Sequence, residues 1–404
     1  MKKLITTTLF ALFLLAACAP AVTPQTPEPA KVTPAQTVEG CFITAHEFPR
    51  QDIPIPVTLL VNAPGVEGLS AYWRDGTFLG TWPTGNLFPS TMVHAASPLV
   101  DGSNATPLIF LGGNEDGTTS LRVSQGGEVR TLKDFPREVT ITGLTGVPGQ
   151  AWIAYSTVEP GADGSSLHSS IYLGEYQSIA GSAAVLTADS AEARILLPVA
   201  IHRDVNNTPD GIWYTYSLWG IGGDSLTDPR AGLYYLKLST GESMEFLGMG
   251  CQFSSLSTGQ NWAALTSEGV LHITELHSGV TNNIRPLPGN DRFAHVFISP
   301  GEGMLAWVEG KGWEYDGTLE TTLRTATIDG AIISEFPVSA FAGPSGLGNE
   351  IAILPLGWLM PENEVLLVAV YSVSTGRASL VYVKIYEREI TPLVSGTFAG
   401  FAYP

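Results

Sequence analysis

The chain has 404 residues, of which 44% are hydrophobic and 14% charged, so it can bury a large core and does not have the composition of a disordered protein. Its formal net charge of −18 opposes binding to nucleic acid and to anionic lipid surfaces through long-range repulsion. The 44 glycines and 28 prolines are spread between short apolar runs, which indicates many short strands joined by turns. Sustained helical spacing of apolar residues is lacking, so we expect one large all-β domain.

The first element is an export signal. Lys2 and Lys3 precede an apolar run over residues 4–15 that is too short to span a bilayer and ends in small residues, as a secretory signal peptide does. The ending Leu-Ala-Ala-Cys resembles the bacterial lipobox, which implies that residues 1–17 are removed and that Cys18 carries lipid. The alternative is a plain export signal in which Cys18 is incidental.

Residues 18–38 follow as a tether. They are rich in Pro, Thr, Ala and Gln, a composition that buries too little apolar surface to fold and favours extended conformations. A second long apolar segment is absent from the sequence, so we expect no transmembrane helix. These features predict an exported protein that is lipid-anchored to the cell envelope on its extracytoplasmic face, with a globular domain over residues 39–404.

Two further cysteines, Cys41 and Cys251, lie in this globular part. Disulfides form and persist in exported proteins, so a Cys41–Cys251 bond is one expectation. Two buried thiols are the alternative, because free cysteines are common core residues.

Apolar runs of strand length recur in groups along the rest of the chain, broken by Gly, Pro, Asn and Asp turns. The groups repeat about every fifty residues with four runs each, which is the period and strand number of propeller blades. We therefore predict a seven-bladed β-propeller, with six blades as the alternative, whose ring is closed by residues 396–404 pairing with the first blade. The predicted blades span residues 56–83, 91–132, 139–188, 195–248, 251–284, 293–338 and 351–394.

The later blades resemble a known repeat. The segment SPGEGMLAWVEG at residues 299–310 is similar to the Ser-Pro-Asp-Gly motif of TolB-type, WD40-like (PD40) β-propeller repeats of bacteria, as are the strand pairs at 233–247 and 271–284. The chain departs from the motif at Gly301 and Thr258, where the family has Asp, and at residues 360–363. The resemblance covers residues 190–395, and it implies a fold and no chemistry.

The sequence gives little support for a serine hydrolase, a zinc site or a calcium site. A Gly-x-Ser-x-Gly nucleophile elbow is absent from the sequence, which argues against a serine hydrolase, and the seven histidines are not spaced as zinc ligands. Asp204, Asn206 and Asp210 place oxygen donors in one loop, as a calcium site does, although the loop lacks the later bidentate acid. An Asx turn is the alternative, so we expect no cofactor other than a candidate calcium ion.

Three histidines, His94, His202 and His295, each fall in the first strand of a predicted blade. Innermost strands line the central channel, so these residues are candidates for ligand binding at the channel mouth. The alternative is three separate core or rim histidines.

The fold predicts a non-catalytic binding or scaffold module for a protein or a small ligand, acting through loops at one mouth of the channel. The alternative is a carbohydrate-active enzyme of the glycoside hydrolase or lyase type, because acidic residues are many and Trp213, Trp219 and Trp313 offer surfaces for sugars. A cluster of carboxylates with a basic residue in the channel mouth would favour this enzyme. A purely structural envelope component is the third possibility.

Overall fold

The computed structural model describes residues 41, 48, 50–85, 93–99, 104–162, 164–218, 226, 230–267, 269–312, 318–359 and 365–403. The chain divides into two compact units, residues 1–33 and 34–404, and every described residue belongs to the second. The expected signal peptide, Cys18 and the tether lie outside the described residues. In the part that the structure describes, no helix combines the length and the apolar character needed to cross a membrane.

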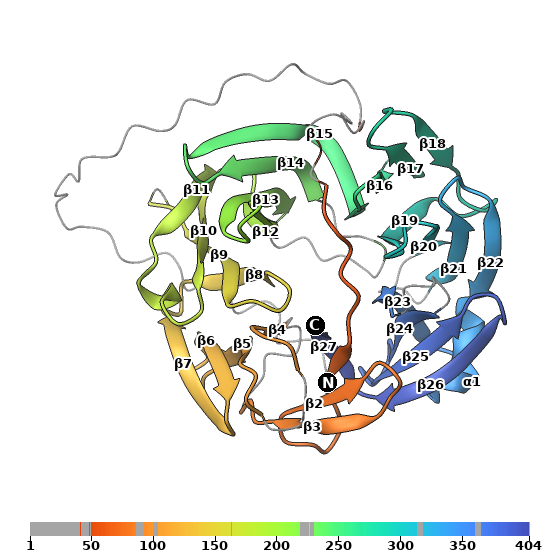
Figure 1. The fold of residues 1–404 in the computed structure, drawn as a ribbon, viewed down its shortest axis with the longest axis horizontal. Coiled ribbons are helices and arrows are strands. Elements are labelled where there is room, and N and C mark those ends of the chain that lie inside the picture. The colour runs from red at the N-terminus through yellow and green to blue at the C-terminus, as the bar shows by residue number, and fades with distance from the viewer. Residues whose placement is uncertain are drawn as a thin grey trace, which may run out of the picture. The chain divides into compact units, whose positions relative to one another are not determined.

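The second unit is a seven-bladed β-propeller with four antiparallel strands in each blade, as predicted. The blades follow one another around a ring (Figure 1). The first three, each given from its innermost strand outward, are β27 (Thr397–Ala402), β1 (Thr58–Asn62), β2 (Leu69–Trp73) and β3 (Phe78–Trp82); β4 (His94–Ala95), β5 (Leu108–Gly113), β6 (Thr119–Gln125) and β7 (Glu128–Phe135); and β8 (Thr140–Gly146), β9 (Trp152–Pro160), β10 (Leu167–Glu175) and β11 (Ala184–Ser190).

The fourth and fifth blades share one strand, β15 (Glu242–Thr258), whose first half is the outermost strand of the fourth blade and whose second half is the innermost strand of the fifth. The other strands are β12 (Arg194–Arg203), β13 (Pro209–Leu218) and β14 (Arg230–Lys237) in the fourth blade, and β16 (Trp262–Ser267), β17 (Val270–Glu275) and β18 (Thr281–Ile284) in the fifth. The sequence prediction of a break between residues 248 and 251 was wrong. The glycines there lie within an extended strand and form no turn.

The sixth and seventh blades are β19 (Arg292–Ile298), β20 (Met304–Lys311), β21 (Glu320–Thr327) and β22 (Ile332–Pro337), and β23 (Ile351–Trp358), β24 (Val365–Ser372), β25 (Ala378–Lys384) and β26 (Glu389–Ser395). Helical structure in the described residues is limited to η1 (Ile179–Gly181), η3 (Val338–Phe341) and α1 (Ala342–Ser345).

The C-terminal strand closes the ring, as the sequence predicted. β27 pairs antiparallel with β1 in a register that places Ala402 opposite Thr58, and so supplies the innermost strand of the first blade. On its other side, the Val93 amide donates to the Ala399 carbonyl across a distance of 2.6 Å, which joins the first blade to the start of the second. An edge strand is thereby covered at the point where the ring would otherwise be open.

The repeat motif builds the tight turn between β19 and β20. Ser299 accepts a hydrogen bond at its carbonyl from the Glu302 amide (2.8 Å), and its hydroxyl accepts one from the Met304 amide (3.0 Å). Glu302 takes a left-handed backbone conformation with φ of 51°. Its carboxylate reaches the preceding blade and accepts a hydrogen bond from the Asn261 side chain at 2.6 Å. The motif therefore fixes a turn and also joins two neighbouring blades.

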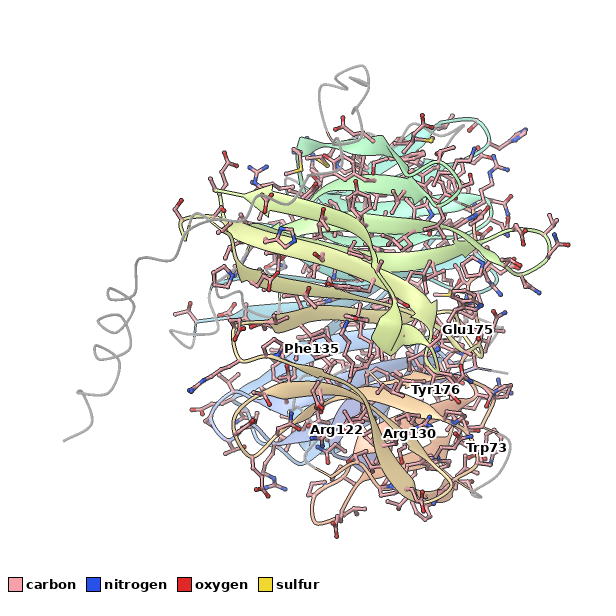
Figure 2. All side chains as sticks on the ribbon, turned by 90° about the vertical axis from the view of Figure 1, so that its left-hand side faces the viewer. Trp73, Arg122, Arg130, Phe135, Glu175 and Tyr176 are labelled. Carbon is pink, nitrogen blue, oxygen red and sulfur yellow. A yellow bond between two sulfur atoms is a disulfide. The ribbon has the colours of Figure 1, made fainter. Side chains whose placement is uncertain are left out.

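Aromatic and basic side chains pack together between the second and third blades. Figure 2 shows these two blades from the side, with Phe135 labelled. The Lys133 ammonium donates to the Tyr155 hydroxyl at 3.0 Å and lies 4.6 Å from the centre of the Tyr172 ring. Burial lowers the pKa of Lys133 and raises that of Tyr155. The lysine thus helps to join two blades through hydrogen-bonding and cation–π contacts.

A disulfide joins Cys41 to Cys251, and both residues are buried beside Phe48, Phe246 and Phe253. The bond spans 210 residues of sequence and attaches the N-terminal segment to the middle of β15. The sequence left a disulfide and two buried thiols as alternatives, and the structure contains the disulfide.

Replacing both cysteines with serine should lower the free energy of unfolding by about 2–4 kcal/mol, because the unfolded chain would no longer be cross-linked. Urea unfolding of the oxidised wild type and of the double variant measures the difference. Wild-type protein unfolded in the presence of a reductant is the control and should behave like the variant. Equal midpoints for all three samples would contradict a stabilising role.

Candidate functional site

A segment of the N-terminal region crosses the interior of the ring from β15 to β1 (Figure 1). We call residues 50–57 the strap. The Gln51 amide donates to the Gly259 carbonyl (3.3 Å), the Gln51 side chain donates to the Thr258 hydroxyl (2.8 Å), and the Val57 amide donates to the Ala402 carbonyl (3.0 Å). Prolines at positions 54 and 56 favour an extended backbone, which suits a crossing segment.

The strap lies at one mouth of the channel. Its hydrogen-bond partners Thr258 and Ala402 are the last residues of the innermost strands β15 and β27. Two compartments lie beside it, with volumes of about 540 Å³ and 290 Å³. Gln51, Pro54 and Tyr403 line both.

The larger compartment, which we call the polar compartment, is bounded by the strap and by the innermost strands of the first four blades. It has a volume typical of small-molecule sites. Its charged and imidazole side chains are Arg50, Asp52, His94, His202, Arg203 and Asp204. The smaller compartment has no charged lining residue, and Ile53, Leu256, Phe297, Leu356 and Trp358 contribute much of its wall.

An acid–imidazole pair lies at the end of β12. His202 Nδ1 is 2.6 Å from Asp210 Oδ1, and the His202 ring meets the edge of Tyr235 with centroids 5.7 Å apart. Burial, reinforced by the negative charge of Asp210, raises the pKa of Tyr235 to about 12, so its hydroxyl stays protonated. Asp210 holds the imidazole with Nε2 directed away from the carboxylate, an arrangement that suits hydrogen bonding or general-base chemistry.

The second imidazole of the polar compartment belongs to β4. His94 Nε2 lies 2.7 Å from the carbonyl oxygen of Gln150, in the turn between β8 and β9. Its ring rests directly on Gly146, where any side chain would collide with it. Burial lowers the pKa of His94, and the bond to Gln150 opposes this shift less strongly. His94 is therefore neutral near physiological pH.

The lowered pKa of His94 predicts a loss of stability in acid. The unfolded chain binds a proton below about pH 6.5 while folded His94 resists it, so the free energy of unfolding should fall as the pH drops through this range. His94→Gln should show a smaller decrease in melting temperature between about pH 7.5 and about pH 5 than the wild type. His277→Gln, at an exposed position, is the control and should keep the wild-type decrease.

The structure brings together two of the three candidate histidines. His94 and His202 line the polar compartment, whereas His295 does not. His295 lies in β19 at an irregularity between Ala294 and Phe297, with a left-handed φ of 54°. This local bulge interrupts the strand register on which the sequence prediction relied.

The oxygen donors of the candidate calcium loop have protein partners. Asp204 Oδ1 accepts hydrogen bonds from the Asn206 amide (2.8 Å) and the Thr208 amide (2.9 Å), which is the geometry of an Asx turn, while Asp210 pairs with His202. These hydrogen bonds lower the pKa of Asp204. Within the described ranges, three or more His, Cys, Asp or Glu side chains are nowhere grouped as a metal site.

Of the three tryptophans considered for sugar stacking, Trp213 is buried against Phe48, Tyr235 and Phe246, so it packs in the core. Trp219 and Trp313 lie outside the described residues. Neither the strap nor Tyr403 was predicted from the sequence to be part of a site. Burial raises the pKa of Tyr403 to about 12. The two prolines of the strap are a sequence signal for an extended segment and do not reveal its path.

No family model matches the chain, and no curated protein matches it. Among solved structures, it is similar to oligogalacturonate lyase from Vibrio parahaemolyticus (10% identity, 86% of each chain, TM-score 0.46) and to TolB from Acinetobacter baumannii (13% identity, 85% of this chain and 83% of that one, TM-score 0.38). It is also similar to a prolyl endopeptidase (12% identity, TM-score 0.41), covering 78% of this chain and spanning about half, 51%, of that one. At these values none of the three indicates what this chain binds or catalyses.

Proposed function

We propose that this propeller is a binding module that holds a small ligand in the polar compartment at the strap-bearing mouth of its channel. The observation that carries the proposal is the compartment of about 540 Å³, whose lining residues include two histidines, two arginines and two aspartates from the strap, β4, β12 and the adjoining loop. Pockets of this size with a few convergent polar groups are the usual form of small-molecule sites.

A ligand screen tests this proposal. Thermal-shift measurements against a library of small polar compounds should find at least one that raises the melting temperature of the wild type in a saturable way. Thr145→Trp, which places a large side chain in the compartment wall, should abolish the shift. Val280→Trp, at an exposed position outside the compartment, is the control and should keep it. A shift that survives Thr145→Trp would place binding elsewhere.

A carbohydrate-active enzyme is the second candidate, and one observation favours it. The His202–Asp210 pair at 2.6 Å resembles a general base with its orienting carboxylate, and Asp52, Arg50 and Arg203 line the same compartment. Two carboxylates are otherwise engaged, because Asp52 Oδ1 accepts a hydrogen bond from Gln260 (3.1 Å) and Asp204 caps its turn. Product formation from oligosaccharides that is lost in His202→Ala would establish catalysis, and binding without turnover would exclude it for those substrates.

The cellular setting is part of the proposal. We propose that residues 1–17 direct export, that Cys18 carries a lipid, and that a tether over residues 18–38 holds the propeller at the extracytoplasmic face of a bacterial envelope. Metabolic labelling with a fatty-acid analogue should label the wild type and not Cys18→Ser. A protein partner at the same mouth is the alternative occupant, and crosslinking pull-down from native membranes tests it.

A further inference from the structure

The two histidines of the polar compartment have fixed hydrogen-bond roles. A carbonyl oxygen can only accept, so His94 Nε2 must carry the proton that it shares with Gln150. The neutral His94 ring therefore has its lone pair on Nδ1. Likewise, the Asp210 carboxylate accepts the proton of His202 Nδ1, which leaves the lone pair of the neutral His202 ring on Nε2.

Both lone pairs belong to residues that line the same compartment. Nothing among the described residues is paired with either nitrogen, since the contacts of His94 and His202 run through the opposite nitrogen of each ring. His94 Nδ1 is thus an acceptor, and His202 Nε2 is an acceptor whenever its ring is neutral, so a ligand that fills the compartment should bring hydrogen-bond donors to meet them.

Donors and acidic groups share the compartment wall. Arg50 uses one nitrogen on the Leu276 carbonyl (3.2 Å), and Arg203 uses one on the Asn207 side chain (3.3 Å), so each guanidinium has further N–H groups. Asp52 and Asp204 balance the two positive charges of the lining. An anionic ligand would be repelled by the carboxylates of Asp52 and Asp204 and has no proton to donate to the histidine lone pairs. An ammonium ligand has no lone pair with which to accept a hydrogen bond from the arginines.

We infer that the polar compartment takes a neutral polyhydroxylated ligand, with one hydroxyl donating to His94 Nδ1 and another to His202 Nε2. A hydroxyl group both donates and accepts, so a ligand rich in hydroxyls satisfies the imidazole acceptors and the guanidinium donors together. This inference rests on the proposed binding function and names the chemical class of the ligand.

The test uses matched probes on the whole propeller domain with its disulfide intact. A panel of neutral mono- and disaccharides is compared with the corresponding uronates, amino sugars and fully O-methylated sugars by saturable binding in isothermal titration. We expect at least one neutral sugar to bind more tightly than its charged counterparts and its O-methylated form. His202→Phe should weaken that binding about tenfold, as expected for the loss of one hydrogen bond. The control His277→Phe should not change it.

Nitrogen-15 NMR of the wild-type imidazoles gives a second readout that does not depend on a variant's folding. The free protein should show neutral His94 with its proton on Nε2, and the neutral sugar should shift the resonance of the unprotonated nitrogen. Preference for a uronate or an amino sugar, lost in Thr145→Trp, would overturn the ligand class and leave the proposed binding function standing. Failure of every sugar also overturns the ligand class. Failure of the wider library would then remove the binding function as well.

Discussion

Replacing Glu309 with alanine should lower the free energy of unfolding by about 3–5 kcal/mol, which is the usual cost of breaking a buried ion pair by removing one partner. Glu309 lies on β20 with 0% of its surface exposed. Its Oε2 accepts from Arg324 and from the Trp307 ring, each at 3.1 Å, and its Oε1 accepts from the Leu287 amide (2.6 Å) and the Asn290 side chain (3.1 Å). The alanine variant leaves four donors without this acceptor.

The cost should be large because Arg324 cannot turn to solvent. Only 7% of its side chain is exposed, and its remaining acidic partner is Glu335 at 2.9 Å. Urea unfolding midpoints measure the effect. Glu320→Ala is a matched control, because Glu320 pairs with Lys311 across the same two strands at the surface and should cost about 1 kcal/mol or less. Similar midpoints for the two variants would show that the buried network adds no stability.

Removing residues 397–404 should prevent formation of the closed ring, which is the largest effect we expect. The deletion takes away β27, exposes the hydrogen-bonding edge of β1 and uncovers the buried residues Leu60 and Val61 that β27 pairs with. Circular dichroism melting and size-exclusion chromatography should show loss of the cooperative transition and aggregation through the open edge. A truncated protein that melts as the wild type does would refute the role of β27.

A single substitution tests the contact on the other side of β27, with the start of the second blade. Gly400 faces the backbone of Val93, and a Cβ atom there would collide with the Val93 carbonyl oxygen. This oxygen belongs to the backbone, so it cannot move aside as the end of a flexible side chain could. Gly400→Ala should therefore cost about 1–3 kcal/mol, the usual cost of overpacking. Gly343→Ala is the control, since a Cβ at Gly343 meets nothing within 4 Å. The two variants should differ in melting temperature, and equal values would contradict close packing of the first two blades at Gly400.

The blades were predictable from the sequence because their signals are local. Apolar runs such as residues 304–308, bounded by glycine and proline, specify strand and turn through burial and backbone geometry within a few residues. The strand character of residues 396–404 is local too, whereas their pairing with the first blade was predicted from the general need to cover an edge strand. The shared strand β15 was not, since Gly248 and Gly250 are compatible with either a turn or an extended strand, and only pairing with β14 and β16 decides between them.

The site was less predictable because it depends on distances between segments far apart in sequence. His94 and His202 were placed on innermost strands, but their convergence depends on a register that the bulge at His295 shows can shift. Gln51 and Tyr403 carry no local signal of function. Their position follows from ring closure and from the strap, neither of which a short sequence window contains.

The polar compartment is assembled from both ends of the described chain, since Gln51 and Tyr403 line it together with the middle strands. A chain in which the C-terminal segment has not yet docked therefore lacks Phe401 and Tyr403 from the wall of this compartment. A ligand that binds only the closed ring would favour closure by mass action, by about 2.7 kcal/mol at a hundred times the dissociation constant. Ligand binding would thus stabilise the closed ring.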